Sequence, residues 1–571
     1  MESRLLKNDP SRENRRKGEK EMGKYISEII GETFKSWRKN EVVFIAAPTG
    51  SGKTMFVLYD LVEYAALQGD KVLYLVNRAL LKDQINEIIN MTVKHELRKN
   101  HIPEEKIRNV IAVKTYQEIE QSCKSQKNIF EEDNRYRYIV ADEAHYFLTD
   151  SLFNTNTAIS FNWIKERREK CTLIFMSATI DRIKEYIITN CKLQPFDEKN
   201  RAEAVRGDIP QQCRYREYAG KADYSWVNLR GLNGLEQIPD LIKKSTGKWL
   251  IFVDSISKGK EIQKILLKEE IQNKFVEART KYDEDIQEDI QGIIKKKSFA
   301  QQVLIATSVL DNGVSIKDYE LRNMIIMTDT DEEFIQMLGR KRLLDEEKRN
   351  AEKVNIYISP KNKKEFEEKH RYFKEKIRFV SEQNIEDDVN IILEKIMQGR
   401  RYYENTRCLG YVQEGKMYWN HLSIAQCDLL YEYYQKIVEK FQEDEENAFL
   451  QEQASWVGRT NGDIVKLVEE SHEDKEAIFA KKLEESLEKI IEENQDGLTK
   501  SQYSNWKTDM KEEIWCFIKD QEGITGNDKK YLGQNDRPLS VEDFALCMKK
   551  AGLKYKVKVE GKKDQTRYII S

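Results

Sequence analysis

One eight-residue segment constrains this chain more than any other. Ala47–Thr54 reads APTGSGKT and stands between the apolar run Val42–Ala46 and a helical pattern that continues to Gln68. A glycine-rich turn between a buried strand and a helix is typical of a phosphate-binding loop, because glycine lets the backbone approach phosphate oxygens and the first amides of the helix point at them. The segment therefore predicts a nucleotide site in an α/β fold.

Each position of this loop has a chemical role in that interpretation. Lys53 would neutralise the β- and γ-phosphates of a nucleoside triphosphate, and the hydroxyl of Thr54 would be a ligand of Mg²⁺. The glycine that usually begins such a loop is replaced here by Ala47. The residues expected to surround the phosphates are Thr49, Gly50, Ser51 and Gly52.

Two adjacent carboxylates follow about 90 residues later in the chain. The apolar run Tyr138–Ala141 ends in Asp142 and Glu143, and the carboxyl ends of strands are where ligands bind in open α/β sheets. Asp142 would hold Mg²⁺, directly or through water, and Glu143 would accept a proton from the attacking water. Alone, the pair is also compatible with a solvated acidic turn. Together with the loop, it favours a site that hydrolyses a nucleotide.

These two segments together resemble those of the superfamily 2 nucleic-acid helicases and translocases of the DEAD/DEAH type. Further segments like those of that family follow in the expected order over residues 25–360. The resemblance implies two tandem RecA-like domains with parallel sheets, which face each other with ATP and Mg²⁺ in the cleft. The further segments are Val76–Gln84, Thr115–Gln117, Ser177–Thr179, Ile251–Ser255, Ala306–Val314 and Gln336–Arg342.

The resemblance also assigns roles to single residues. Gln336 and Arg340 of the second domain would reach the γ-phosphate, and Ser177 and Thr179 would link hydrolysis to domain movement. Gly313 would belong to the nucleotide-binding set. The residues expected to grip the backbone of DNA or RNA, largely without regard to base sequence, are Arg78, Thr115, Ser255 and Thr307.

Three departures from the family pattern affect these assignments. Leu343 occupies the place of a second arginine, so that Arg342 either substitutes for it or is structural. Ser315 stands where the family often has aspartate. No glutamine precedes Gln68, so that the adenine-reading Q motif is absent and we expect weak discrimination among nucleotides.

Strand and helix patterns divide the chain into five regions. We expect a charged arm at 1–24, RecA-like domain 1 at 25–200 and RecA-like domain 2 at 201–375, because short apolar runs alternate with helical patterns there. Amphipathic helices without strands are expected for an accessory region at 376–496. A small domain at 497–571 has a helix followed by two short strands, which resembles a winged helix.

Three features of the carboxy-terminal part allow two interpretations each. The aromatic and aliphatic group within 431–441 has the spacing of a helix core, although it could also stack bases. The lysine-rich tail 549–567 is either a solvated end or a surface for duplex phosphates. The acidic helical segment 473–493 is either a solvated face or a surface for a protein partner.

Composition excludes several classes of protein. Lys and Arg total 96 and Asp and Glu total 99, which excludes a uniformly basic nucleic-acid coat. No apolar run approaches the roughly 18–20 residues of a membrane span, so we expect no membrane partner. The eight cysteines form no CxxC pair and the histidines do not cluster. We therefore expect no zinc site and a reducing, cytoplasmic location, with the cysteines acting as small buried hydrophobes.

These observations predict an ATP-driven helicase or translocase. One alternative is an ATP-gated clamp or motor subunit of a larger complex, for example in genome defence or a mobile element, without unwinding of its own. Another is a phosphate-loop enzyme unrelated to nucleic acid.

Overall fold

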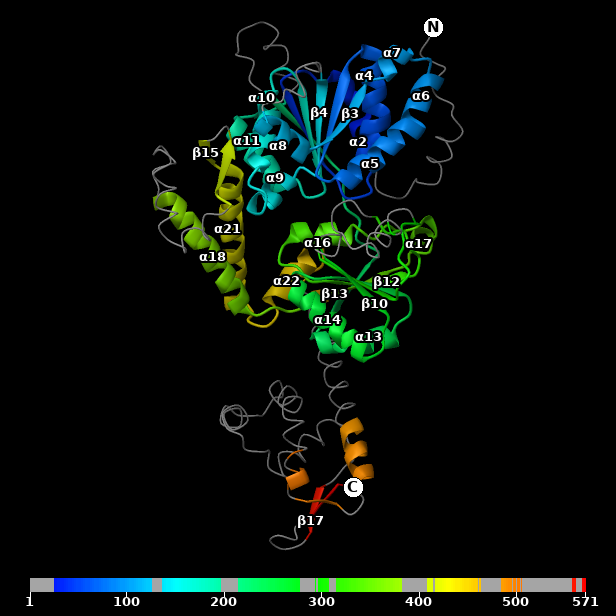
Figure 1. Ribbon diagram of the computed structural model, residues 1–571, viewed down its shortest axis with the longest axis vertical. Coiled ribbons are helices and arrows are strands. Elements are labelled where there is room, and N and C mark those ends of the chain that lie inside the picture. Colours follow the sequence, from blue (N-terminus) through cyan, green and yellow to red (C-terminus); the bar gives the residue numbers. More distant parts are fainter. Residues whose placement is uncertain are drawn as a thin grey trace. The chain divides into compact units, whose positions relative to one another are not determined.

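The computed structural model forms two compact units (Figure 1). The first consists of Met1–Asn228, Thr246–Ile356 and Lys361–Gly458, and the second of Leu229–Ser245, Tyr357–Pro360 and Arg459–Ser571. The residues that the structure describes are 25–125, 136–196, 214–277, 293, 296–307, 315–382, 408–413, 416–460, 462–463, 484–494, 497–499, 501–503, 505, 557–560 and 567–570.

A seven-stranded parallel sheet organises the first part of the chain, with the order β3-β2-β4-β5-β1-β7-β6. Its central strands are almost wholly buried, as expected when helices cover both faces of a parallel sheet. We call residues 25–219 the first lobe. The strands are β1 (Glu41–Ala46), β2 (Lys71–Val76), β3 (Ile111–Thr115), β4 (Tyr136–Asp142), β5 (Thr172–Ser177), β6 (Gln194–Pro195) and β7 (Arg214–Ala219).

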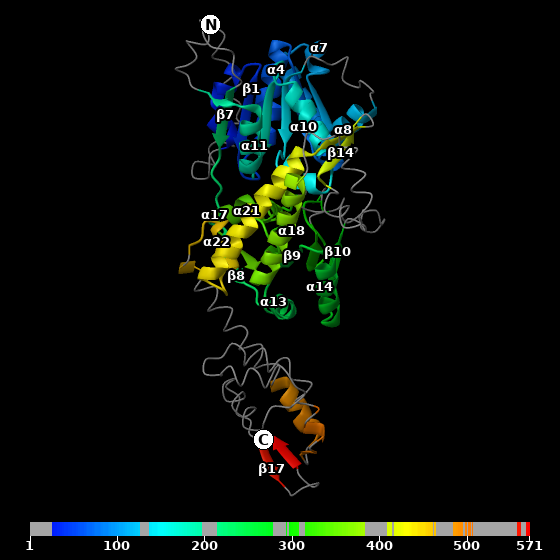
Figure 2. The same cartoon turned by 90° about the vertical axis from the view of Figure 1, so that its left-hand side faces the viewer.

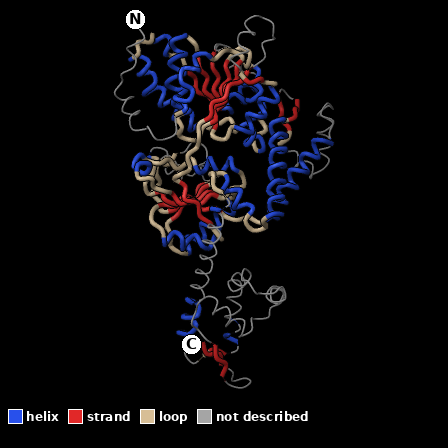
Figure 3. Tube along the Cα trace, turned by 180° about the vertical axis from the view of Figure 1, so that it is seen from behind, coloured by secondary structure: helices blue, strands red, loops and turns tan. Residues whose placement is uncertain are grey.

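Helices cover both faces of this sheet (Figure 3) and create two separate hydrophobic clusters. The helix predicted from residue 54 to 68 is present, but its middle, Phe56–Leu61, is wound as a π-helix. It ends at Gly69, whose φ of 75° suits glycine. The longer helices are α4 (Val62–Gln68), α5 (Ala79–Ile88), α8 (Tyr116–Ser125), α10 (Thr157–Glu166) and α11 (Asp181–Cys191); the shorter are α2 (Ile26–Ile30), α3 (Lys53–Met55), α6 (Lys94–Lys99), α7 (Glu104–Ile107) and α9 (Tyr146–Thr149).

A six-stranded sheet follows, with the order β10-β11-β9-β12-β13-β8. Strand β9 pairs in parallel with both β11 and β12, which makes it the centre of the sheet. We call residues 246–356 the second lobe. The strands of the sheet, of which β8 precedes the lobe and β13 extends two residues past it, are β8 (Val227–Gly231), β9 (Lys248–Phe252), β10 (Asn273–Val276), β11 (Val303–Ala306), β12 (Leu321–Ile326) and β13 (Val354–Ile358). The helices of the lobe are α14 (Ile256–Lys268), α16 (Asp331–Leu338) and α17 (Asp345–Arg349).

The expected boundary near residue 200 is wrong, because β7 lies beyond it and completes the first sheet. Its six residues pair in parallel with β1, from Glu41 opposite Arg214 to Ala46 opposite Ala219. The backbone amide of Gly220 then donates to the carbonyl oxygen of Ala46 (2.7 Å). The chain therefore leaves the first lobe directly beside the end of β1.

A second expectation, that strands vanish after residue 375, is also wrong. Residues 410–419 form the antiparallel hairpin β14 (Gly410–Gln413) and β15 (Lys416–Trp419). The helices described in and just before this region are α18 (Lys363–Glu382), α21 (His421–Glu443) and α22 (Ala448–Ser455). Helices α18 and α21 lie along one another (Figure 2).

These helices enclose a third hydrophobic cluster, which decides between the two interpretations of the aromatic group. Tyr434, Ile437 and Phe441 are buried in it, and Tyr431 and Tyr433 pack against it. The group is therefore core. Cysteines 408 and 427 are buried in the same cluster, as expected for small hydrophobes.

The second unit contains a small three-stranded sheet, ordered β16-β18-β17. Strands β17 (Val557–Glu560) and β18 (Arg567–Ile570) are antiparallel and match the predicted hairpin, and β16 (Leu498–Thr499) adds to its edge. The helix expected before this hairpin lies outside the described residues, so that the winged-helix interpretation stays a prediction. No helix in the described part of the chain has the length and apolar character needed to cross a membrane.

Phe44, in the central strand β1, provides a test of this core. It is fully buried and packs against the rings of Phe175 and Tyr215. Phe44→Ala should lower the free energy of unfolding by about 3–5 kcal/mol, because a buried ring leaves a cavity. This corresponds to a fall of about 6–20 °C in the thermal midpoint of the lobe, measured by calorimetry. The matched Phe153→Ala variant, at a side chain that is 89% exposed, should change the midpoint little.

Candidate nucleotide site

The loop after β1 has the backbone geometry of a phosphate cradle. Gly50 and Gly52 have φ values of 90° and 86°, which other residues rarely adopt, and α3 begins immediately afterwards at Lys53. The Nζ of Lys53 donates to the carbonyl oxygens of Ala47 (2.6 Å) and Pro48 (3.2 Å). The lysine therefore folds back over its own loop, where it faces the centre of the cradle.

Burial destabilises the charged form of Lys53, because its ammonium group loses contact with water. Desolvation lowers its pKa, while the nearby carboxylates of Glu143 and Asp142 oppose that change. The guanidinium groups of Arg342 and Arg340 lower the pKa further. The pKa of Lys53 thus depends on the charges of its neighbours. Lys53, Arg340 and Arg342 together would favour the negative charge of a bound phosphate group.

Thr54 and Asp142 converge on one point, as a magnesium site requires. The hydroxyl of Tyr74 donates to Asp142 Oδ2 (2.7 Å) and lies 3.4 Å from Thr54 Oγ1, so that a single atom lies next to both groups. A hydroxyl and a carboxylate are the hard oxygen ligands that Mg²⁺ prefers. These residues fit a Mg²⁺ that keeps several waters and binds the phosphates of a nucleotide.

The pKa of Asp142 is raised to about 6, chiefly by burial and then by the neighbouring charge of Glu143. The hydrogen bond from Tyr74 acts in the opposite direction and favours the carboxylate. Tyr74 thus helps to keep a buried magnesium ligand ionised near neutral pH.

Glu143 occupies a strained position at the end of β4. Its φ is 49°, in the left-handed region that few residues other than glycine adopt. Burial raises the pKa of Glu143, but His145, Lys53, Arg340 and Arg342 outweigh it, and the net pKa is lowered. Glu143 is therefore an ionised carboxylate at neutral pH, held at the edge of the sheet by its backbone.

A chain of hydrogen bonds leads from Glu143 to the second lobe. Ser177 Oγ lies 3.5 Å from Glu143 Oε2 and 2.8 Å from His145 Nδ1, and it accepts the backbone amide of Thr179 (3.0 Å). Thr179 Oγ1 in turn accepts from Gln336 Nε2 (3.5 Å) on α16. The structure therefore brings together four of the predicted residues from both lobes.

The segment after α16 places two arginines beside this site. Arg340 and Arg342 both bond to the backbone of Ile316, so that the segment is extended, and alternate side chains share one face. Lys341 points the other way and pairs with Glu347 (2.6 Å). Arg342 therefore lies on the same face as Arg340, where burial lowers its pKa to about 10.

Two close approaches tie the phosphate loop to these residues. A Cβ at Gly50 would lie 2.9 Å from Arg342 Nη1, and a Cβ at Gly339 would collide with Thr49 Oγ1. Arg340 is buried, and its Nε donates to the carbonyl oxygen of Gln336 (3.0 Å). The second lobe thus presents its end of α16 directly to the loop of the first lobe.

Two family models match the two parts of the chain that form this site. Residues 19–182 match the model described as type III restriction enzyme, res subunit, and residues 233–344 match the helicase conserved C-terminal domain. These are the regions that supply the loop and the facing arginines. Both lobes therefore match helicase-type domain models, as the resemblance to superfamily 2 helicases implies.

Two solved structures are among those that resemble this chain. S. cerevisiae Dbp5 bound to RNA and ADP BeF3 is 15% identical over 56% of this chain and 79% of its own, with a TM-score of 0.37. A point variant of that protein with the same ligands gives the same identity and coverage and a TM-score of 0.34. No curated protein gave a significant match. The likeness to helicases therefore depends on the two domain models and the motifs.

Of the residues expected to contact nucleic acid, Arg78 and Thr115 lie at the paired ends of β2 and β3 in the first lobe, whereas Ser255 and Thr307 lie in the second lobe. Arg78 is exposed before α5, with Nη2 3.8 Å from Asp150. Thr115 and Ser255 both accept backbone amides with their hydroxyls, from Glu118 and Lys258, and so act as helix caps. Thr307 donates its amide to β10. Gly313 lies outside the described residues.

Two residues of the site were missed in the sequence, Tyr74 and Arg182. Tyr74 carries the one hydroxyl in the apolar run of β2, and that polar tip is a signal that could have indicated a buried partner. Arg182 follows the Ser177–Thr179 segment and forms ion pairs with α16. Nothing in its sequence context distinguishes it from other surface arginines.

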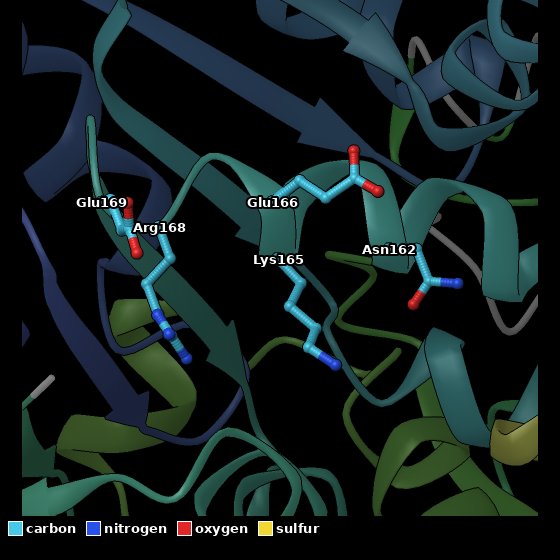
Figure 4. A pocket seen from close by; sticks show the side chains of 5 residues that line it. All are labelled: Asn162, Lys165, Glu166, Arg168 and Glu169. Atoms are coloured by element: carbon cyan, nitrogen blue, oxygen red, sulfur yellow. The ribbon is translucent and has the colours of Figure 1, made fainter.

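A separate pocket of about 210 Å³ lies at the end of α10. The side chains that line it point in different directions (Figure 4), so that they form no convergent set of ligands. They are Asn162, Lys165, Glu166, Arg168 and Glu169.

The pKa of Asp142 gives a pH test of the metal site. The free carboxyl takes up a proton below about pH 6, and a protonated group cannot bind Mg²⁺. The affinity for Mg²⁺ with ATP should therefore fall as pH falls from 7 to 5, by up to about tenfold per pH unit. Binding of a fluorescent ATP analogue measures this.

Tyr74→Phe supplies the matched control. It removes the hydrogen bond that lowers the pKa of Asp142, so the loss of affinity should begin at a higher pH than in the unmodified protein. Asp142→Asn should bind weakly at every pH. An unchanged pH profile in the Tyr74→Phe variant would contradict this account of Asp142.

Proposed function

We propose that this chain is an ATP-driven helicase or translocase that acts on DNA or RNA and hydrolyses ATP between its two lobes. The observation that carries the proposal is the approach of Arg340 and Arg342 to the loop that holds Lys53, together with the Gln336–Thr179 hydrogen bond. A nucleotide in the loop would therefore contact both lobes.

The first lobe would bind the substrate ATP and activate water. The loop amides and Lys53 would hold the phosphates, and Thr54 and Asp142 would hold Mg²⁺, which supplies positive charge next to the phosphoryl group. Glu143 would accept the proton of the attacking water, a task for which its lowered pKa keeps it ionised.

The second lobe would stabilise the charge that develops on the γ-phosphate. Arg340 is the first candidate, and Arg342 is the second because it lies on the same face of its segment. An arginine in this position contributes about 10³–10⁵ to the rate in related phosphoryl-transfer enzymes. Loss of the γ-phosphate would weaken the Thr179–Gln336 connection, and the lobes would then separate.

Movement along nucleic acid would follow from this opening and closing. Exposed Arg78 could contact backbone phosphates, whereas Thr115 and Ser255 would do so mainly through the helix ends that they cap. Contacts to phosphates carry little sequence information, and they weaken steeply with salt.

A motor subunit of a larger complex is the second candidate function. It is favoured by the match of residues 19–182 to a model described as the res subunit of a type III restriction enzyme. In that case ATP hydrolysis would depend on nucleic acid without independent strand separation.

Two variants test the hydrolytic site. Lys53→Ala and Glu143→Gln should each lower ATP turnover by at least about 10²-fold, because one removes the phosphate counter-charge and the other removes the proton acceptor. Steady-state phosphate release with and without polynucleotide measures this, and circular dichroism checks the fold. Turnover retained by Lys53→Ala would contradict the phosphate-loop assignment.

Strand displacement separates the two candidate functions. A chain that runs as a monomer and unwinds a labelled duplex with ATP is a helicase, whereas nucleic-acid-stimulated ATPase without unwinding favours the motor subunit. The assay uses single- and double-stranded DNA and RNA over a salt series. ATPase that is indifferent to every polynucleotide would instead indicate a phosphate-loop enzyme unrelated to nucleic acid.

A further inference from the structure

An arginine of the first lobe is bound by two carboxylates of the second. Arg182, near the start of α11, places Nη2 2.7 Å from Asp331 Oδ1 and Nη1 3.1 Å from Glu332 Oε2. Glu332 is buried and the arginine side chain is only 20% exposed. Partly buried, two-partner pairs of this kind hold a more definite geometry than exposed single pairs.

The helical region joins the same contact. The guanidinium of Arg182 lies over the ring of Tyr433 on α21, 5.7 Å from its centre, and the Tyr433 hydroxyl donates to the carbonyl oxygen of Asp329 (2.7 Å). The Asp329 carboxylate pairs with Lys361, just before α18, and with Lys369 on α18. Three parts of the first unit therefore meet at one point.

The N-terminal end of α21 is anchored in the first lobe. Ser423 Oγ donates to the carbonyl oxygen of Ser151 (2.8 Å), and Asn420 Nδ2 donates to that of Thr155 (3.2 Å). Both side chains are fully buried, and Leu422 between them belongs to a hydrophobic cluster of the first lobe. Helix α21 thus runs from a fixed base on the first lobe to a contact with the second.

An aromatic contact also joins the helical region to the second lobe. Trp456, which follows α22, packs on Phe334 of α16 with ring centres 5.3 Å apart. Phe334 lies between the carboxylates that bind Arg182 and the nucleotide-facing Gln336. The helical region therefore holds the helix that presents Gln336 to the phosphate loop.

We propose that α18, α21 and α22 form a strut that holds α16 against the first lobe, with Arg182 as a positioning residue at its end. The strut would favour the closed arrangement of the lobes and so help to place Gln336 and Arg340 at the phosphate loop. This inference deepens the proposed function, since closure matters to turnover only if ATP is the substrate. The contacts themselves do not depend on it.

Hydrogen exchange in the full chain without nucleotide tests the strut directly. Arg182→Gln removes both ion pairs, so the amides of α16 should exchange about fivefold faster or more. Lys184→Gln, on the same helix, is the matched control because its partners, Asp181 and Glu217, both lie in the first lobe. Equal exchange of α16 in the Arg182→Gln variant and the unmodified chain would overturn the proposal, and so would equal acceleration by the two variants.

A charge exchange distinguishes pairing from local damage. Arg182→Asp alone should accelerate exchange in α16, and adding Asp331→Arg should restore protection at least in part, because the pair is then re-formed with its charges reversed. A double variant that exchanges as fast as Arg182→Asp alone would count against the pair as the element that joins the lobes.

The KM and kcat for ATP distinguish a positioning role of Arg182 from a role in stability alone. If the strut favours closure, Arg182→Gln should raise KM for ATP about fivefold and leave kcat at saturating ATP within about twofold. A lower kcat with unchanged KM would indicate a smaller folded fraction and would overturn the positioning role. If the unmodified chain has no ATPase, the proposed function fails, while the exchange experiment still decides the strut.

Discussion

The structure of the site depends on a set of charges buried at one edge of the first sheet. Lys53, Asp142 and Glu143 lie there together, and Arg340 and Arg342 approach from the second lobe. An isolated buried charge is very costly, and removing one member of a buried pair leaves the other uncompensated. Each member therefore needs the others, which explains why the sheet edge, the strained backbone of Glu143 and the second lobe act as one structure.

The parts of the fold that could be predicted from the sequence are the buried parallel strands, because such strands consist mainly of consecutive apolar residues. Strands β1, β2, β4 and β5 are buried over most of their length, so each contains a continuous apolar run that is easy to find. Strand β7, Arg214–Ala219, was missed because it is only half-buried and reads RYREYA. Its place was decided by pairing with β1, which no local pattern records.

The site residues divide in the same way. The loop and the carboxylates could be predicted because their chemistry depends on neighbours in the sequence. Tyr74, which contacts both Thr54 and Asp142, and Arg182, which reaches α16, depend on partners that only the fold brings close. Arg342 was left open from the sequence, and the extended backbone around Lys341 explains why it faces the same way as Arg340.

The departure of the chain from the first lobe has a mechanical consequence. Gly220 is bonded to Ala46, and a Cβ there would touch Ala47, the first residue of the phosphate loop. The covalent tether to the rest of the protein is thus fastened at the very margin of the nucleotide cradle. A force that pulls on this connecting segment would act on the phosphate loop before it reached any other part of the lobe. Mechanical strain and nucleotide binding would therefore affect the same few residues.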